Sequence, residues 1–189
     1  LTPIFHKLLK KSFKIKDAIF VNIGGIVNIT KIKNDDSMSG TDIGPGMCLI
    51  DRWVRTKTKK NYDVNGAIAK SGKINDESLN LLLNNFYKTE GMSSVGLIQS
   101  FDTKYFDFSS VKNLSLEDGA ATLTEFTARI IISSIKSLDR YKEKIILCGG
   151  GRKNFFLIDR LKKASDRIKL IDEYKIDGDF VESQAFAYI

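Results

Sequence analysis

The sequence predicts an α/β domain with a mixed sheet, in which antiparallel hairpin strands are flanked by helices. Residues 19–32 read as two strands joined by Gly24-Gly25, because apolar positions alternate on the first side and resume on the second. Residues 144–148 form a short apolar strand that runs directly into Gly149-Gly150-Gly151 and then into a helical pattern. At 189 residues, the chain is long enough for one domain with a substantial core.

A short helix is predicted at the start of the chain. Four apolar residues recur there at helical spacing: Ile4, Phe5, Leu8 and Leu9. This spacing would place three lysines on the outer face: Lys7, Lys10 and Lys11. His6, the only histidine, lies on the same helix. A lone histidine in such a helix is usually structural, so we assign it no chemistry.

A third extended run leads through Met38 to Asp42, and Gly44-Pro45-Gly46 then forces a turn. Pro45 is suited to the first position of a helix, and that helix continues through Trp53. The elements expected downstream are helices at 76–87 and 117–138, a helix opening at 152–154, a strand at 168–171 and a helix at 182–187.

Composition narrows the class of protein. The chain is 42% hydrophobic and 28% charged, and no apolar run approaches the ~20 residues of a membrane span, so we expect no membrane partner. The net charge is +7, but the densest basic cluster, residues 55–60, is not interleaved with aromatic residues, so we expect no nucleic-acid partner. Cys48 and Cys148 have no metal or redox spacing. Free thiols in the cytoplasm are the expected state, with no protein-held metal.

The two glycine-rich turns suggest a phosphate site. Gly24-Gly25 would present backbone N–H groups without obstructing side chains, and a helix N-terminus follows Gly46. Asp42 would lie beside this site at a strand exit. Taken alone, each signal has a plain structural alternative: a hairpin at Gly24-Gly25 and a turn-forming aspartate at Asp42. Gly149-Gly150-Gly151 is neither a Walker loop nor a GxGxxG fingerprint.

Taken together and in order, these stretches resemble one family. The sequence reads Asn-Ile-Gly-Gly-Ile-Val-Asn-Ile-Thr at 22–30 and Asp-Ile-Gly-Pro-Gly at 42–46, followed by Leu-Ile-Asp-Arg-Trp at 49–53. It is similar to the anhydro-N-acetylmuramic acid kinases, sugar kinases of the actin and hexokinase superfamily. Further similar stretches lie at 62–69, 118–128, 147–154 and 182–187.

The resemblance implies an RNase H-like domain of the actin/hexokinase type. The chain begins with Leu1 and matches the family from its midpoint onward. Residues 1–189 would therefore form the single C-terminal nucleotide-binding domain of a two-domain sugar kinase, with the N-terminal half absent. The implied reaction is ATP-dependent phosphorylation of 1,6-anhydro-N-acetylmuramic acid, with ring opening to N-acetylmuramate 6-phosphate. This reaction belongs to peptidoglycan recycling and amino sugar metabolism.

The resemblance also assigns site residues. Asp42 would be the catalytic base. The expected contacts to ATP are Asn22, Gly24, Gly25, Asn28, Gly44, Gly149, Gly150, Gly151 and Asn154. Mg²⁺ would be held largely through phosphate and water. The other expected partners are the anhydro amino sugar and the missing N-terminal half, and a homodimer is left open.

Some positions depart from the family pattern. Ile43 stands where the family has threonine, Met47 stands where it has asparagine, and residues 99–106 match its substrate loop poorly. Asp51 is the rival carboxylate, read as a helix-surface or capping residue. Two alternatives therefore stay open: a nucleotide-binding half-domain without activity of its own, and a non-enzymatic basic interaction domain.

Overall fold

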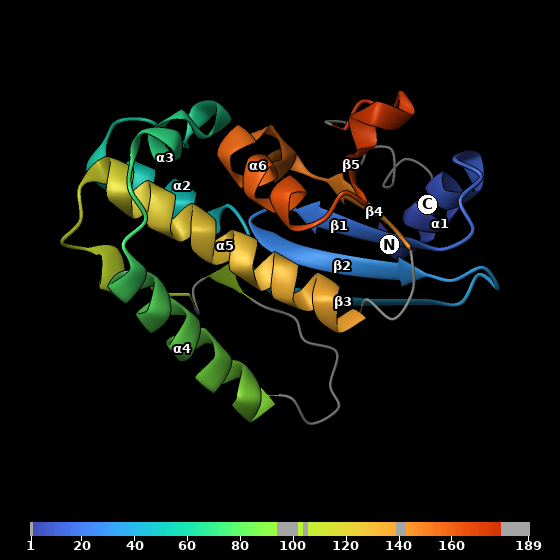
Figure 1. Ribbon diagram of the computed structural model, residues 1–189, viewed down its shortest axis with the longest axis horizontal. Helices are drawn as coiled ribbons and strands as arrows, with labels where there is room; N and C mark the ends of the chain where they lie inside the picture. The colour runs from blue at the N-terminus through green and yellow to red at the C-terminus, as the bar shows by residue number, and fades with distance from the viewer. Residues whose placement is uncertain (1, 94–101, 104–105, 139–142, 179–189) are drawn as a thin grey trace.

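The structure is a computed structural model that describes residues 2–93, 102–103, 106–138 and 143–178. Within these residues, five strands form one mixed sheet in the order β3-β2-β1-β4-β5 (Figure 1). The strands are β1 (Ala18–Ile23), β2 (Ile26–Ile32), β3 (Met38–Pro45), β4 (Lys144–Cys148) and β5 (Ile168–Leu170). Strands β1, β2 and β3 pair antiparallel, whereas β4 pairs parallel with both β1 and β5. The predicted hairpin and mixed sheet are confirmed.

Helices occupy the stretches between the strands. The α-helices are α1 (Thr2–Ser12), α2 (Cys48–Lys57), α3 (Ala67–Ser71), α4 (Asp76–Ser93), α5 (Leu116–Leu138) and α6 (Phe155–Ala164). Short 3₁₀ turns lie at η1 (Val64–Gly66), η3 (Ser109–Val111), η4 (Gly150–Lys153) and η5 (Ile171–Tyr174). The helix expected at 182–187 falls outside the described residues, as do parts of the 99–106 loop.

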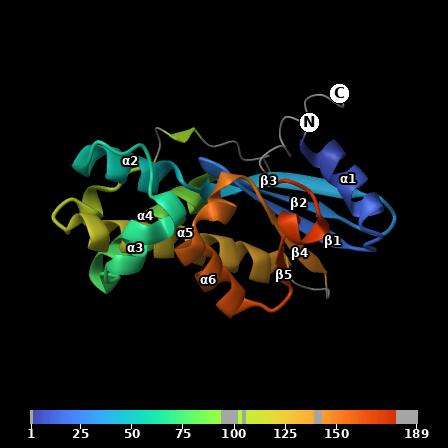
Figure 2. The same cartoon turned by 90° about the horizontal axis from the view of Figure 1, so that it is seen from above.

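Alternation along the strands divides the core into two layers. On β1, Ile19, Val21 and Ile23 pack with α2, α5 and α6, whereas Phe20 on the opposite face packs with Phe5 of α1. Figure 2 shows α1 on one side of the sheet, with α5 and α6 on the other. The sheet is therefore covered on both faces, which explains why all six residues of β1 are buried.

The connection between β3 and α2 differs from the sequence expectation. Pro45 is the last residue of β3 rather than the first of a helix, and α2 begins at Cys48. Three consecutive N–H groups, at residues 46–48, donate to the carbonyls of Gly24 and Gly25 at 2.9–3.2 Å. These bonds hold residues 46–48 against the β1–β2 turn. The helix α2 therefore starts at Cys48, three residues after Pro45.

Lys10 was also placed wrongly by the helical spacing. Its side chain is buried, and its ammonium donates to the carbonyl of Lys33 and to Asp36 Oδ1, the latter at 3.2 Å. Lys7 and Lys11 also pair with Asp36. The reason is tertiary: Asp36 lies in the β2–β3 connection, 26 residues from Lys10, and the spacing within α1 carries no information about it.

Helices α2 and α5 make a close contact at Trp53, whose side chain is 1% exposed. The indole N–H donates to the carbonyl of Leu116 at 2.9 Å. Gly119 faces the ring, and a Cβ at this position would overlap it. A glycine in α5 thus allows α2 to approach closely enough to bury the indole completely.

We expect stability to depend on pH through His6, which stacks on Phe20 at 4.5 Å between ring centroids. Neither ring nitrogen has a hydrogen-bond partner among the described residues, and burial lowers the pKa of His6 to about 4. In the unfolded chain His6 is protonated below about pH 6.5, whereas in the folded chain it is protonated only below about pH 4. The free energy of unfolding should fall by about 2 kcal/mol from pH 7.5 to pH 5 through this group.

Urea unfolding of the wild type and of His6→Phe at the two pH values measures this contribution. The variant keeps a flat aromatic ring on Phe20 but cannot be protonated. Asp51, whose raised pKa acts in the opposite direction, is present in both proteins, so the difference between them isolates His6. An equal pH dependence in the two proteins would contradict the assignment.

Candidate functional site

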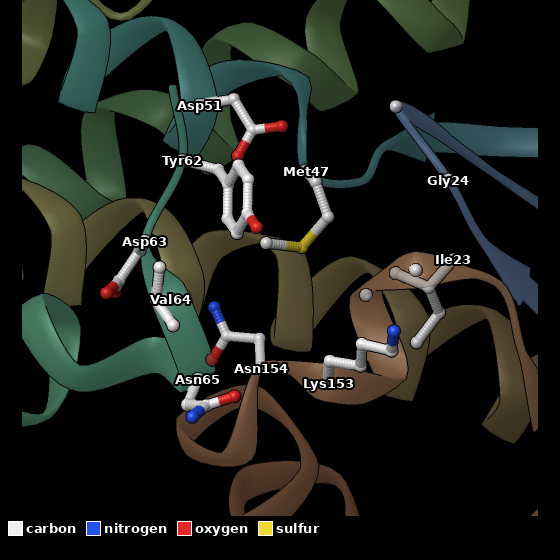
Figure 3. A pocket seen from close by; sticks show the side chains of 13 residues that line it. Ile23, Gly24, Met47, Asp51, Tyr62, Asp63, Val64, Asn65, Lys153 and Asn154 are labelled. Carbon is white, nitrogen blue, oxygen red and sulfur yellow. The ribbon is translucent and has the colours of Figure 1, made fainter. Parts of the chain in front are cut away.

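A pocket of about 380 Å³ opens where the β1–β2 turn, the start of α2, the η1 turn and the η4 turn meet (Figure 3). The pocket is lined by Ile23, Gly24, Gly25, Met47, Asp51, Tyr62, Asp63, Val64, Asn65, Gly150, Gly151, Lys153 and Asn154. It thus brings together both predicted glycine segments, which are separated by more than 120 residues of sequence. Five of the residues predicted to contact ATP line it: Gly24, Gly25, Gly150, Gly151 and Asn154.

The β1–β2 turn forms one wall of the pocket. The Gly24 N–H donates within the turn to the carbonyl of Ile26 at 3.2 Å, and the carbonyls of Gly24 and Gly25 accept from the connection to α2. Gly24 therefore contributes the absence of a side chain rather than its own amide. A Cβ on Gly25 would approach no atom closer than 3.9 Å. Packing within this chain therefore does not require glycine at position 25.

The three glycines after β4 serve different purposes. Gly149 has a φ of +80°, and a Cβ there would lie 2.5 Å from Asn22 Oδ1. A Cβ on Gly151 would overlap the side chain of Ile23. Both glycines are therefore needed for the turn to pack on β1. A Cβ on Gly150, in contrast, would have no neighbour within 4 Å, so this glycine leaves open a space that a side chain would occupy.

Asn154 follows η4 and caps α6. Its side-chain Oδ1 accepts from the Leu157 N–H at 3.0 Å, and its residue is 3% exposed. The amide Nδ2 is buried and has no hydrogen-bond partner among the described residues. Lys153 precedes it and projects into the same pocket, so a positive charge accompanies the start of α6 (Figure 3).

Asp51 lies in the first turn of α2 and lines the pocket, instead of facing solvent as the sequence suggested. Burial raises the pKa of Asp51 to about 6, while the positive charge of Arg55 opposes that shift. Its Oδ1 is buried without a hydrogen-bond partner among the described residues. Sequence reasoning missed this orientation because it depends on how the β1–β2 turn fixes the start of α2.

The wall opposite the glycines comes from residues 62–65, which sequence reasoning did not assign to the site. Asp63 accepts from the N–H groups of Ile68 and Ala69 at 2.8 and 2.9 Å and so caps the start of α3 (Ala67–Ser71). These two bonds span η1, where Asn65 has a φ of +58°. Tyr62, Val64 and Asn65 are thereby presented to the pocket. In the sequence, only the resemblance of residues 62–69 to the family pattern could have indicated that this segment belongs to the site.

Three other predicted residues meet outside the pocket, in one row across the antiparallel strands. Asn22 on β1 is opposite Asn28 on β2, and Asn28 is opposite Asp42 on β3. Directly opposed residues on antiparallel strands share a face of the sheet. The structure therefore gathers a half-buried carboxylate and two carboxamides, none of which lines the pocket.

Gly44 is a packing position. Its φ is +145°, and a Cβ there would lie 2.8 Å from the ring of Phe86. This position does not line the pocket, so its glycine is explained by close packing of β3 on the helices. Among the described residues, no cluster of metal-binding side chains is found. None of the helices in the described ranges is long and apolar enough to cross a membrane.

The topology defines the chain as a domain of the actin-like ATPase fold. One solved structure with this fold is the activator of 2-hydroxyisocaproyl-CoA dehydratase from Clostridium difficile with bound ADPNP. It matches at a TM-score of 0.51 and 14% identity, over 83% of this chain and 54% of the other. Component A of the Acidaminococcus fermentans (R)-2-hydroxyglutaryl-CoA dehydratase matches at a TM-score of 0.50 and 15% identity, over 89% and 59%.

The chain belongs to the anhydro-N-acetylmuramic acid kinase family, whose family model matches residues 1–189. The family member from Pelagibacter ubique (strain HTCC1062) is 47% identical over 100% of this chain and 52% of its own length. The member from Pseudomonas syringae pv. tomato is 34% identical over 100% and 53%. This chain therefore spans about half the length of the curated relatives it matches. The family resemblance and the fold class expected from the sequence are confirmed.

Proposed function

We propose that this chain is the C-terminal, nucleotide-binding half of a kinase that phosphorylates 1,6-anhydro-N-acetylmuramic acid with ATP and opens its anhydro ring. The product is N-acetylmuramate 6-phosphate, an intermediate of cell-wall recycling in the cytoplasm. The observation that carries this proposal is the pocket between the two glycine turns, in a chain of this kinase family. The open space at Gly150 and the unobstructed wall at Gly25 fit a nucleotide, because backbone can approach a ligand closely only where no Cβ intervenes.

Several residues would hold the nucleotide. Gly24 and Gly25 form the wall nearest the β1–β2 turn, and Gly150 and Gly151 form the opposing turn. Lys153 adds the positive charge that phosphate groups require. When bound, ATP supplies the phosphoryl group, and Mg²⁺ neutralises the charge that develops on it. Asn22, Gly44 and Gly149 act indirectly in this scheme, by shaping the strands and turns that carry these contacts.

Asp42 is the proposed catalytic base. Its carboxylate accepts a proton from a water molecule as that water attacks the anomeric carbon of the anhydro sugar, which breaks the bond to the bridging oxygen. The freed oxygen at C6 is then the acceptor of the phosphoryl group. Asn28 lies directly opposite Asp42 on the neighbouring strand, and in this scheme it would orient the same water or a sugar hydroxyl. General-base assistance of this kind typically contributes about 10²- to 10⁴-fold to the rate.

A weaker alternative is a nucleotide-binding half-domain without catalytic activity. Ile43 is buried in the core, and Met47 lines the pocket. Neither side chain replaces the polar groups that family members carry at these positions. Both residues flank the β3–α2 connection close to Asp42, so this site has fewer polar groups with which to orient a reactant. ATP binding is common to both alternatives, and only turnover separates them.

The chain alone should bind ATP but turn over little or no anhydro sugar, because the closed, water-excluding site of a two-domain kinase needs both of its walls. Calorimetry with ATP and Mg²⁺ measures binding. A phosphorylation assay, with and without the half of the Pelagibacter ubique relative that this chain does not cover, measures turnover.

Absence of ATP binding would reject the proposed function. Robust turnover by the chain alone, in its monomeric state, would reject its role as half of a site. Binding with no turnover after the other half is added, provided that the two halves associate, would favour the non-catalytic alternative. Gel filtration reports both that association and any homodimer.

A further inference from the structure

Two buried polar atoms in the pocket lack partners among the described residues. One is the acceptor Oδ1 of Asp51, and the other is the donor Nδ2 of Asn154. Leaving a buried polar group unsatisfied costs stability, so such atoms in a folded protein call for an explanation. Both residues line the same pocket, from α2 on one side and from the start of α6 on the other (Figure 3).

The surrounding structure holds both groups in place. Asn154 Oδ1 is committed to the Leu157 N–H at 3.0 Å, which fixes the carboxamide and assigns Nδ2 as its remaining donor. Asp51 is carried by the first turn of α2, whose start is tied to the β1–β2 turn by three backbone hydrogen bonds. A ligand between them would therefore meet a fixed acceptor and a fixed donor.

We infer that Asp51 and Asn154 recognise the ribose hydroxyls of the bound nucleotide, an inference that rests on the proposed function. A vicinal diol matches this pair because each hydroxyl both donates and accepts a hydrogen bond. One hydroxyl donates to Asp51 while its neighbour accepts from Asn154 Nδ2.

The distribution of charge in the pocket supports this placement. Phosphate groups would be repelled by Asp51, whereas Lys153 and Ile23 lie together on the side of the pocket away from it (Figure 3). The base would take the less polar surfaces of Met47, Val64 and Tyr62. The diol is then the part of the nucleotide that remains for Asp51 and Asn154.

The test measures the affinity of the chain for ATP, 2′-deoxy-ATP, 3′-deoxy-ATP and inosine triphosphate by calorimetry. Two isosteric variants remove one group each. Asp51→Asn removes the charged acceptor, and Asn154→Asp removes the donor while keeping an oxygen to cap α6. Asp76→Asn makes the same charge change at an exposed site on α4 and serves as the control. Circular dichroism verifies the fold of each variant.

The wild type and the control should bind ATP about tenfold or more tightly than at least one deoxy analogue, the effect expected for a hydrogen bond to a charged group. Asp51→Asn and Asn154→Asp should each reduce that preference to threefold or less.

The inference is overturned if the folded wild type binds ATP and both deoxy analogues equally, or if the preference survives both substitutions. The proposed function would stand in either case. Selective loss of discrimination against inosine triphosphate would instead place the pair on the edge of the base, which also overturns the ribose assignment. If the wild type fails to bind ATP at all, the proposed function and this inference fail together.

Discussion

Asp42→Asn should abolish measurable turnover in an enzyme reassembled from this chain and the complementary half of a relative. The substitution keeps the shape of the side chain but removes its ability to accept a proton, so we expect a fall in kcat of at least 10²- to 10⁴-fold. The affinity for ATP should be unchanged, because Asp42 lies in the cross-strand row with Asn28 and does not line the pocket. Steady-state kinetics and calorimetry on the same preparation separate the two effects.

Asp51→Asn is the matched comparison, because it makes the same chemical change on a carboxylate that does line the pocket. At saturating ATP its effect on kcat should be much smaller than that of Asp42→Asn, since the affected contact is to the nucleotide. If Asp51→Asn eliminates turnover while Asp42→Asn stays within tenfold of the wild type, the base has been assigned to the wrong carboxylate. The mechanism would then have to be rebuilt around α2.

Gly150→Val should weaken ATP binding by tenfold or more without unfolding the chain. A side chain at position 150 would meet no protein atom within 4 Å, so the fold should accept it, yet it would occupy the space along which a nucleotide approaches the backbone. Gly150→Ala should have a smaller effect in the same direction. Calorimetry gives the affinities, and thermal unfolding followed by circular dichroism verifies that the fold is retained.

Neighbouring glycines are unsuitable for this test. Gly149→Val would force a β-branched residue to a φ of +80°, and a side chain at Gly151 would overlap Ile23, so both variants should lose stability first. A Gly150→Val variant with wild-type stability and wild-type ATP affinity would show that the nucleotide does not contact the turn after β4. The proposed role of the pocket would then be wrong.

Elements governed by local pattern could be predicted from the sequence. The alternation at Ile19, Val21 and Ile23 located β1, because successive side chains of a strand point to opposite faces of the sheet. Gly24-Gly25 located the turn that follows. The triple glycine likewise located a turn between β4 and α6. The pairing of β4 with β1 is parallel and joins segments more than 120 residues apart, so no local pattern could predict it, and the family resemblance implied only the fold class with its mixed sheet.

The composition of the pocket could be predicted only in part. Its glycines and Asn154 carry recognisable turn and cap signals. Asp51 and residues 62–65 enter the pocket through tertiary contacts: the β1–β2 turn sets the start of α2, and η1 packs against α6 and η4. Helical periodicity gives the faces of an isolated helix, but it does not identify which face meets a distant segment. The buried Lys10 was missed for the same reason.

The packing of Trp53 has a spectroscopic consequence. It is the only tryptophan in the sequence, so the intrinsic fluorescence of the chain reports on a single location, the contact between α2 and Gly119 of α5. The ammonium group of Lys57 lies 4.6 Å from the centroid of the indole ring. Asp51, which lines the pocket, lies two residues before Trp53 on α2. A ligand that shifts α2 will therefore change the emission of this one indole. The fluorescence of Trp53 is therefore a label-free signal for a movement of α2 against α5.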